Sequence, residues 1–208
     1  WTYFSPPPKG PDADVGATPT LFTVGDRDVV GVGDKAGTFD VFDRDTGETV
    51  WAKELTPGSP LGGVMVSAAY AEPASGGDGP GGENGAIFVA SNDMDPAQLA
   101  SSNSTTHHSS LFALDAATGD TIWEKRLVGA TFGSITYADG VVYRPSVPGV
   151  LQAVDAETGH ELWSVEPGGD MGAGVRVEDG WVLAPYGFWF FGGQSDLPAG
   201  VVAYQLPD

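Results

Sequence analysis

Three ten-residue segments of this 208-residue chain repeat one pattern without gaps. Each reads apolar, Asp, two variable residues, Thr, Gly, two variable residues, apolar, Trp, and the copies occupy residues 42–51, 114–123 and 154–163. A short strand-like run precedes each copy, and a fourth run at residues 201–204 begins another. Self-similarity at such a period indicates a repeat architecture, because each unit buries its apolar surface against its neighbours.

A second signal runs in phase with the first. Asp139-Gly140 and Asp179-Gly180 stand 40 residues apart, as do Trp123 and Trp163, and Asn84-Gly85 holds the matching place in an earlier copy. Such pairs favour tight hairpin turns because both residues tolerate positive φ. Each repeat then comprises four short strands in about 40 residues, the size of one propeller blade. A β-sandwich with accidental similarity is the alternative, and two motifs in register argue against it.

The sequence therefore predicts an all-β chain, a β-propeller of about four four-stranded blades. Trp1 fits the closing Trp of an upstream repeat, so we expect half of a seven- or eight-bladed ring. A missing N-terminal half or a second chain would supply the rest. The expected units are a connection from the upstream blade at 1–16 and blades at 17–55, 62–128 (with loop insertions), 129–167 and 170–208.

Composition excludes several classes of partner. The net charge is −19, from 28 acidic and 9 basic residues, and so acidic a surface repels nucleic acid and anionic membranes. No apolar run approaches the roughly 20 residues of a membrane span. The chain has no Cys, which removes disulfides and thiolate metal sites. Its 31 Gly and 16 Pro suit short strands joined by many turns.

The repeated pattern resembles the tryptophan-docking motif of PQQ quinoprotein β-propellers, and the resemblance covers nearly the whole chain. In that family the Trp packs between blades, which implies that Trp51, Trp123 and Trp163 are largely buried. Non-enzymatic relatives, such as outer-membrane assembly lipoproteins, share the motif. The pattern therefore implies the fold more strongly than it implies chemistry.

Residues 10–19 and 30–37 resemble two segments of the PQQ-dependent alcohol dehydrogenases, closest to the C-terminal half of the polyvinyl-alcohol dehydrogenase kind. The first segment implies Asp12 as catalytic base and metal ligand, with Asp14 as the alternative base because the local alignment tolerates a slip. The second implies that Lys35 contacts the quinone oxygens. Residues 56–63 are also similar, but the aromatic that follows in those relatives is absent here.

The implied chemistry explains these residue types. Oxidation of an alcohol needs a base for the hydroxyl proton as hydride leaves for the quinone. A cation or Ca²⁺ stabilises the charge that develops on the quinone oxygens. The resemblance thus implies PQQ and Ca²⁺ as cofactors, held tightly only by a complete ring. It also implies a small or polymeric alcohol as substrate, a cytochrome or dye as electron acceptor, and a periplasmic or extracellular location.

Each candidate residue has a simpler interpretation. Asp12 and Asp14 fit ordinary turn residues after Pro11, and Lys35 fits a surface lysine in a hairpin. Trp189 lies in an aromatic run beside Gly-Gly that could form a stacking wall for the cofactor or simply pack a loop. The alternative function is a propeller that has lost its cofactor and acts as a protein-binding or assembly scaffold.

Overall fold

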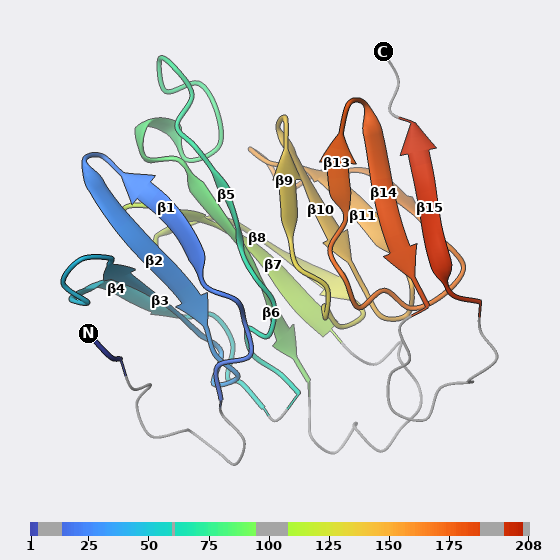
Figure 1. Ribbon diagram of the computed structural model, residues 1–208, viewed down its shortest axis with the longest axis horizontal. Helices are drawn as coiled ribbons and strands as arrows, with labels where there is room; N and C mark the ends of the chain where they lie inside the picture. Colours follow the sequence, from blue (N-terminus) through green and yellow to red (C-terminus); the bar gives the residue numbers. More distant parts are fainter. Residues whose placement is uncertain (4–13, 60, 95–107, 188–197, 206–208) are drawn as a thin grey trace.

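The computed structural model describes residues 1–3, 14–59, 61–94, 108–187 and 198–205. These residues form four antiparallel sheets that stand side by side (Figure 1), which confirms the predicted all-β architecture. No helix in the described ranges is long and apolar enough to cross a membrane. The elements are β1 (Thr20–Val24), β2 (Arg27–Gly33), β3 (Thr38–Asp43), β4 (Thr49–Glu54), β5 (Ala69–Ala71), η1 (Gly82–Asn84), β6 (Ala86–Asp93), β7 (His108–Asp115), β8 (Thr121–Val128), β9 (Thr136–Ala138), β10 (Val141–Pro145), β11 (Leu151–Asp155), β12 (Glu161–Val165), β13 (Arg176–Glu178), β14 (Trp181–Tyr186) and β15 (Gly200–Gln205).

Each sheet is a meander whose strands follow one another in sequence order. The first three sheets have four strands, and the last has three, β13-β14-β15, within the described ranges. The first strand of each sheet contacts the first strand of the next: β1 contacts β5, β5 contacts β9, and β9 contacts β13. The first strands are therefore innermost, and the strands that carry the repeated Trp are outermost. This is the radial arrangement of propeller blades.

The Asp of each repeat builds the turn before the Trp strand. In the second sheet, Asp115 Oδ1 accepts hydrogen bonds from the backbone N–H (2.9 Å) and the hydroxyl (3.2 Å) of Thr118. The backbone N–H of Gly119 then donates to the Asp115 carbonyl oxygen at 2.9 Å. The same bonds recur around Asp43 and Asp155, where they lower the pKa of the carboxyl. The Asp and Thr of the pattern thus close a local turn.

The Trp of one sheet docks on the turn of the next sheet. Trp51 Nε1 donates to the Ala116 carbonyl oxygen at 3.0 Å, and Trp123 Nε1 donates to that of Ala156 at 2.9 Å. Trp51 is 8% exposed, whereas Trp123 and Trp163 have intermediate burial and pack against the core clusters between the sheets. Their strands are the outermost of their sheets, so part of each ring faces solvent.

The apolar residue before the Trp lies outside the core in the second and third sheets. The register shifts by one residue just before Trp51, Trp123 and Trp163, so one extra residue bulges out of each outer strand. In the second and third sheets the extra residues are Ile122 and Leu162, which are 41% and 53% exposed. The bulge turns the Trp toward the neighbouring sheet.

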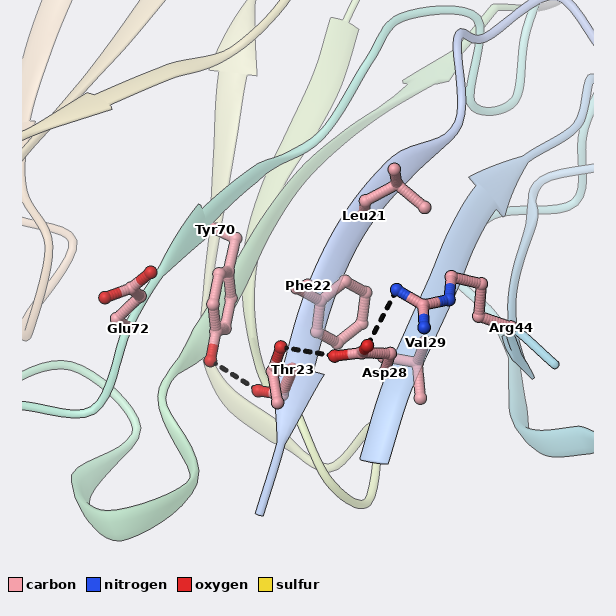
Figure 2. Close-up of a pocket in the computed structure, with 8 residues that line it drawn as sticks. All are labelled: Leu21, Phe22, Thr23, Asp28, Val29, Arg44, Tyr70 and Glu72. Atoms are coloured by element: carbon pink, nitrogen blue, oxygen red, sulfur yellow. Dashed lines mark hydrogen bonds and ion pairs between the residues drawn. The ribbon is translucent and has the colours of Figure 1, made fainter. Parts of the chain in front are cut away.

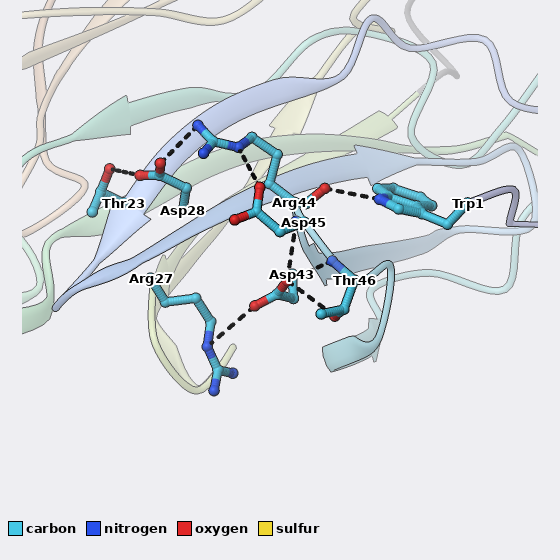
Figure 3. A network of polar contacts seen from close by, with 8 residues as sticks. All are labelled: Trp1, Thr23, Arg27, Asp28, Asp43, Arg44, Asp45 and Thr46. Carbon is cyan, nitrogen blue, oxygen red and sulfur yellow. Dashed lines mark hydrogen bonds and ion pairs between the residues drawn. The ribbon is translucent and has the colours of Figure 1, made fainter.

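Trp1 occupies the docking position on the first sheet, as predicted for the Trp of an upstream repeat (Figure 3). Its Nε1 donates to the Arg44 carbonyl oxygen at 2.8 Å, and its ring centroid lies 6.1 Å from that of Phe42. A Cβ on Gly47 would lie 2.5 Å from the indole, the same approach that Trp51 makes to Gly119. The first sheet therefore presents a complete docking site for the Trp of a preceding sheet.

The predicted hairpin turns are present in the third and fourth sheets. Asp139 and Gly140 have φ of 46° and 81°, and Asp179 and Gly180 have φ of 50° and 75°, so both residues of each pair lie in the left-handed region. Asn84-Gly85 differs. It ends a 14-residue connection at 72–85 that includes the short helix η1, because this repeat carries an insertion where the others have a two-residue turn.

The hydrophobic core consists of the interfaces between adjacent sheets. Between the first and second sheets, Val29, Phe39 and Trp51 pack against Ile87 and Leu114. Two similar clusters lie between the second and third sheets and between the third and fourth. Every sheet therefore has an upstream face, toward the preceding sheet, and a downstream face, toward the following one.

Candidate functional site

The meander topology separates two ends of the sheets. The hairpin turns and the Thr-Gly turns lie at one end, here called the turn end. Strands β2, β6 and β14 run toward the opposite end, at the lower edge of Figure 1, where the second-to-third-strand loops and the connections between sheets lie. This loop end holds Asp14, in the connection that enters β1, and Lys35, in the turn between β2 and β3.

Lys35 and Asp14 form a close ion pair. Lys35 Nζ lies 2.7 Å from Asp14 Oδ1, and the backbone N–H of Lys35 donates to the Asp14 carbonyl oxygen at 3.0 Å. The lysine side chain is 13% exposed, whereas that of Asp14 is 64% exposed. The hydrogen bond from Lys35 lowers the pKa of the Asp14 carboxyl. Asp14 is thus an ionised, solvent-accessible carboxylate at neutral pH.

The turn that carries Lys35 is fixed by its own residues. Asp34 Oδ1 accepts from the backbone N–H of Thr38 at 3.0 Å, and the Asp34 carbonyl oxygen accepts from the N–H of Gly37 at 3.1 Å. Gly37 has φ of 85°, and a Cβ there would lie 2.2 Å from the Thr56 carbonyl oxygen. Only glycine fits this position, so the Gly that follows Lys35 by two residues is required by the turn.

The connection from the first sheet to the second clamps this turn from the other side. Ser59 N–H donates to the Lys35 carbonyl oxygen at 3.2 Å, and Val64 N–H donates to that of Asp34 at 2.8 Å. The Ser59 hydroxyl oxygen is buried and has no hydrogen-bond partner among the described atoms. A buried hydroxyl without a partner is costly, and it leaves a hydrogen-bonding group next to the lysine turn for a ligand or a water.

Two buried carboxyls, those of Asp34 and Asp40, lie at and behind the lysine turn, and sequence reasoning missed them as a pair. Asp34 and Asp40 are 4% and 6% exposed, and Tyr3 hydrogen-bonds to the Asp40 carboxyl. Burial, and then the negative charge of Asp34, raise the pKa of Asp40 to about 6. The alternation of Thr38-Phe39-Asp40-Val41 could have placed Asp40 on the opposite face from Phe39 and Val41. The residues that cover Asp40 depend on where the N-terminal segment packs.

The remaining predicted residues are not tested by this geometry. Asp12 and Trp189 lie outside the described residues, so their predicted roles in catalysis, metal binding and cofactor packing stay predictions. Among the described residues there is no group of three or more His, Asp or Glu that could hold a metal ion. The structure thus brings together Lys35 and Asp14, the alternative base of the sequence interpretation.

A fully buried arginine is the other charged residue that sequence reasoning missed. Arg144, on β10, is 0% exposed, and its guanidinium donates to Thr131 Oγ1 (2.8 Å), Gln152 Oε1 and Ser109 Oγ (2.6 Å each), and to the carbonyl oxygens of Gly129 and Val128. All of these acceptors are neutral, and burial lowers the pKa of Arg144 to about 9. These bonds connect β10 and Gln152 of the third sheet with Ser109 of the second sheet and with the connection between the two sheets.

Two pockets of the described structure lie away from the ion pair. One pocket, with a volume of about 230 Å³, lies beside β1 and β2, toward the turn end. Its lining includes Leu21, Asp28, Arg44, Tyr70 and Glu72 (Figure 2). A second pocket of about 240 Å³ lies at the loop end of the last sheet, around Pro185, Tyr186 and Gly187. Neither pocket includes Asp14 or Lys35.

The chemistry of the site fits one edge of PQQ, a planar anionic quinone. Lys35 supplies a cation and Asp14 a carboxylate, and both lie at the loop end of the first sheet. The fit is limited to this edge, because Lys35 is the one positively charged side chain described beside Asp14. Further contacts to a molecule of that size would have to come from other sheets.

The family described as outer membrane protein assembly factor BamB matches residues 35–185. The chain belongs to this family of PQQ-type repeat propellers. The match begins at Lys35 and spans the docking motifs of all three complete repeats.

Individual relatives include both enzymes and assembly proteins. The chain is 26% identical over 178 residues to a polyvinylalcohol dehydrogenase of Sphingopyxis, which aligns 78% of this chain with 25% of that protein. The quinohemoprotein alcohol dehydrogenase of Comamonas testosteroni has a TM-score of 0.57 at 18% identity, covering 81% of this chain and 33% of the other. BamB of Moraxella catarrhalis has a TM-score of 0.55 at 18% identity, covering 84% and 44%.

These comparisons confirm the family resemblance and the propeller fold. The chain spans a quarter of the length of the Sphingopyxis relative and less than half of either solved protein. It is therefore a PQQ-type repeat propeller unit related to PQQ alcohol dehydrogenases and to BamB.

Proposed function

We propose that this chain forms part of a PQQ- and Ca²⁺-dependent alcohol dehydrogenase of the polyvinyl-alcohol dehydrogenase kind, contributing its C-terminal half. The observation that supports this is the ion pair of Lys35 Nζ with Asp14 Oδ1 at 2.7 Å, at the loop end of the first sheet. The Sphingopyxis relative, named as a polyvinylalcohol dehydrogenase, aligns with 78% of the chain. The units 17–55, 62–128, 129–167 and 170–208 are proposed as its four blades.

In this proposal Asp14 acts as the general base. Its lowered pKa keeps it ionised at neutral pH, and its 64% exposure lets an alcohol reach the carboxylate. Asp14 takes the hydroxyl proton of the substrate as the carbinol carbon loses hydride. PQQ, held beside Lys35 and Asp14, would supply the acceptor for that hydride and its two electrons, so that the alcohol would become a carbonyl compound.

Lys35 has two tasks in this scheme. It holds Asp14 in place through both its ammonium and its backbone N–H, and it stabilises negative charge on the quinone oxygens. The clamped turn around Gly37 fixes the lysine backbone, so little reorganisation is needed when charge develops. Calcium, the electron acceptor (a cytochrome or a dye), the small or polymeric alcohol and the periplasmic or extracellular location belong to the same proposal.

Turnover of variants in the complete ring, loaded with PQQ and Ca²⁺, tests the assignment. We expect Asp14→Asn to lower kcat for dye-linked alcohol oxidation by about 10²–10⁴-fold, the usual contribution of a general base, while PQQ stays bound. Lys35→Ala should weaken both turnover and PQQ binding. Asp28→Asn is the matched control, because Asp28 makes an equally short ion pair, with Arg44, at the turn end of the same sheet. If Asp12→Asn abolishes turnover and Asp14→Asn does not, the base is Asp12.

The second candidate function is a scaffold without cofactor chemistry. The family match favours it, since that family carries the description of an outer membrane protein assembly factor. On this proposal the complete ring shows no PQQ-dependent turnover of primary, secondary or polymeric alcohols, and Asp14→Asn has no effect on its partner binding. Turnover that depends on PQQ excludes the scaffold interpretation.

A further inference from the structure

A groove lies between the first two sheets at the turn end. The hairpin turn and the outermost strand of the first sheet contribute Val24, Asp26, Arg27 and Val50 to its lining, and the Thr-Gly turn of the second sheet contributes Ala117. Its volume is about 480 Å³, a size typical of ligand sites in proteins. Because both walls belong to described sheets that pack on each other, the groove is formed by these two sheets alone.

Two hydrogen bonds between the sheets fix the walls of the groove. Trp51 Nε1, on the outermost strand β4, donates to the carbonyl oxygen of Ala116, in the Thr-Gly turn of the second sheet, at 3.0 Å. The Tyr70 hydroxyl, on the second sheet, donates to the carbonyl oxygen of Thr23, the residue before Val24, at 2.8 Å. The groove is thus preformed, and a ligand that enters it does not have to order the backbone first.

Part of the lining is apolar. Val24 and Val50 are half-buried and pack against the hydrophobic cluster between the two sheets, and Ala117 is also half-buried. Val50 is the apolar residue before the Trp in the repeated pattern, and Ile122, which holds its place in the second sheet, is 41% exposed. An apolar side chain that covers such a lining is removed from water together with it, which favours binding.

The turns around the groove carry an excess of negative charge. In the first sheet, residues 24–28 and 43–48 hold five carboxylates and two arginines: Asp26, Asp28, Asp43, Asp45, Glu48, Arg27 and Arg44. Each arginine already lies beside a carboxylate, with Arg27 Nε 3.6 Å from Asp43 Oδ2 and Arg44 Nη1 2.7 Å from Asp28 Oδ2 (Figure 3). The turn at 115–120 of the second sheet adds two more carboxylates and no basic residue. The surroundings of the groove therefore attract a cation and repel an anion.

We propose that this groove binds a lysine- or arginine-rich segment of another protein, with an apolar side chain of that segment on Val24, Val50 and Ala117. The positively charged groups beside that side chain pair with the carboxylates of the two turns, of which Asp26 lines the groove. Opposite charges across such a surface speed association and select the partner. The apolar contact adds affinity, because it removes apolar area from water.

Other classes of occupant match the groove less well. An acidic segment meets like charge, and a polyamine brings positive charge without a side chain for the apolar lining. The groove and the Lys35–Asp14 pair lie at opposite ends of the first sheet, so a bound segment leaves the candidate site accessible. Binding of the segment is thus independent of whether the complete protein is a dehydrogenase or a scaffold.

Titration of the ¹⁵N-labelled chain with the end-blocked pentapeptide Lys-Leu-Lys-Leu-Lys tests the site directly. We expect chemical-shift changes of backbone amides centred on Val24, Val50 and Ala117, and binding that weakens as salt is added, since exposed charges are screened. Lys-Gly-Lys-Gly-Lys and spermine should bind at least about tenfold more weakly, because they bring no apolar side chain. Either control ligand bound as tightly as the leucine peptide, shifts centred elsewhere, or no shifts at millimolar peptide overturns the proposal.

Two pairs of variants separate the charge from the apolar lining. Asp26→Lys should weaken binding of the leucine peptide about tenfold, whereas Glu157→Lys, the same charge reversal in the exposed turn of the third sheet, should change it by less than about twofold. Val50→Thr should weaken binding, and Ile122→Thr, at the same place in the second sheet, should not. Circular dichroism checks that each variant keeps its fold. Equal effects of Asp26→Lys and Glu157→Lys would show a response to net charge alone and would overturn the proposal. None of these measurements involves PQQ or turnover.

Discussion

The indole of Trp51 lies so close to Gly119 that a Cβ on the glycine would be 2.6 Å from ring atom Cε3. Trp1 approaches Gly47 and Trp123 approaches Gly159 in the same way. The Gly of the repeated pattern therefore meets two demands. It adopts φ of about +70° to +77° in the turn, and it gives the Trp of the preceding sheet room to dock.

Replacing this glycine should show how much stability depends on the left-handed backbone and how much on the room for the Trp ring. We expect Gly119→Ala to lower the free energy of unfolding by about 2–5 kcal/mol, about 1–2 from left-handed backbone strain and about 1–3 from overlap with Trp51. Gly140→Ala is the matched control, because Gly140 has φ of 81° but no atom within 4 Å of the added Cβ. It should lose only the strain contribution. Equal losses in urea unfolding would show that the Trp contact imposes no constraint.

Even a conservative substitution of Arg144 should lower the stability of the fold. Lysine keeps the charge but cannot reproduce the fork that reaches Thr131, Ser109 and Gln152, so buried acceptors lose their partners. We expect Arg144→Lys to lower the free energy of unfolding by about 2–4 kcal/mol. Arg176→Lys, at an exposed position, should stay within about 0.5 kcal/mol of the natural chain. A neutral Arg144→Lys would mean that the network is not needed to join the second and third sheets.

Asp40 should make stability fall as the pH rises. Its pKa is raised to about 6 in the folded chain, above the unfolded value near 3.9, so the folded state favours the protonated carboxyl. Its stabilising contribution is complete below about pH 4 and is lost as the pH rises through 6. Asp40→Asn should remove this loss and raise the free energy of unfolding at pH 7 by about 1 kcal/mol, with solvent screening taken into account. An unchanged pH profile between 4 and 7 would contradict the burial of Asp40.

The Asp14–Lys35 pair should be visible in an NMR titration of the Asp14 carboxyl carbon. We expect a pKa below the ordinary aspartate value, because the ammonium of Lys35 hydrogen-bonds to the ionised form. Lys35→Gln should move the pKa back up. Lys53→Gln, which removes another lysine of the same sheet, should leave it unchanged. If Lys35→Gln has no effect on the titration, the pair does not form in solution.

Much of the fold follows from the sequence because its determinants are local. The carboxylate of Asp115, the hydroxyl of Thr118 and Gly119 lie within five residues, and together they close a turn wherever the pattern occurs. The same holds for the left-handed pair Asp139-Gly140. Three copies of the Asp-Thr-Gly turn, in phase with Trp, were enough to predict the sheets and the place of Trp1 as the Trp of an upstream repeat. Strand pairing within a meander needs no further information.

Other features were decided only by tertiary structure. Ile122 and Leu162 look like core residues in the pattern, but a bulge places them in solvent. The contact of Lys35 with Asp14, the alternative base of the sequence interpretation, depends on how two connections pack on one turn, and the preferred base Asp12 lies outside the described residues. Arg144 could not be foreseen because its acceptors come from three separate segments. Hydrogen bonds and burial across segments that are distant in sequence depend on the path of each connection, and no residue pattern of short range encodes that path.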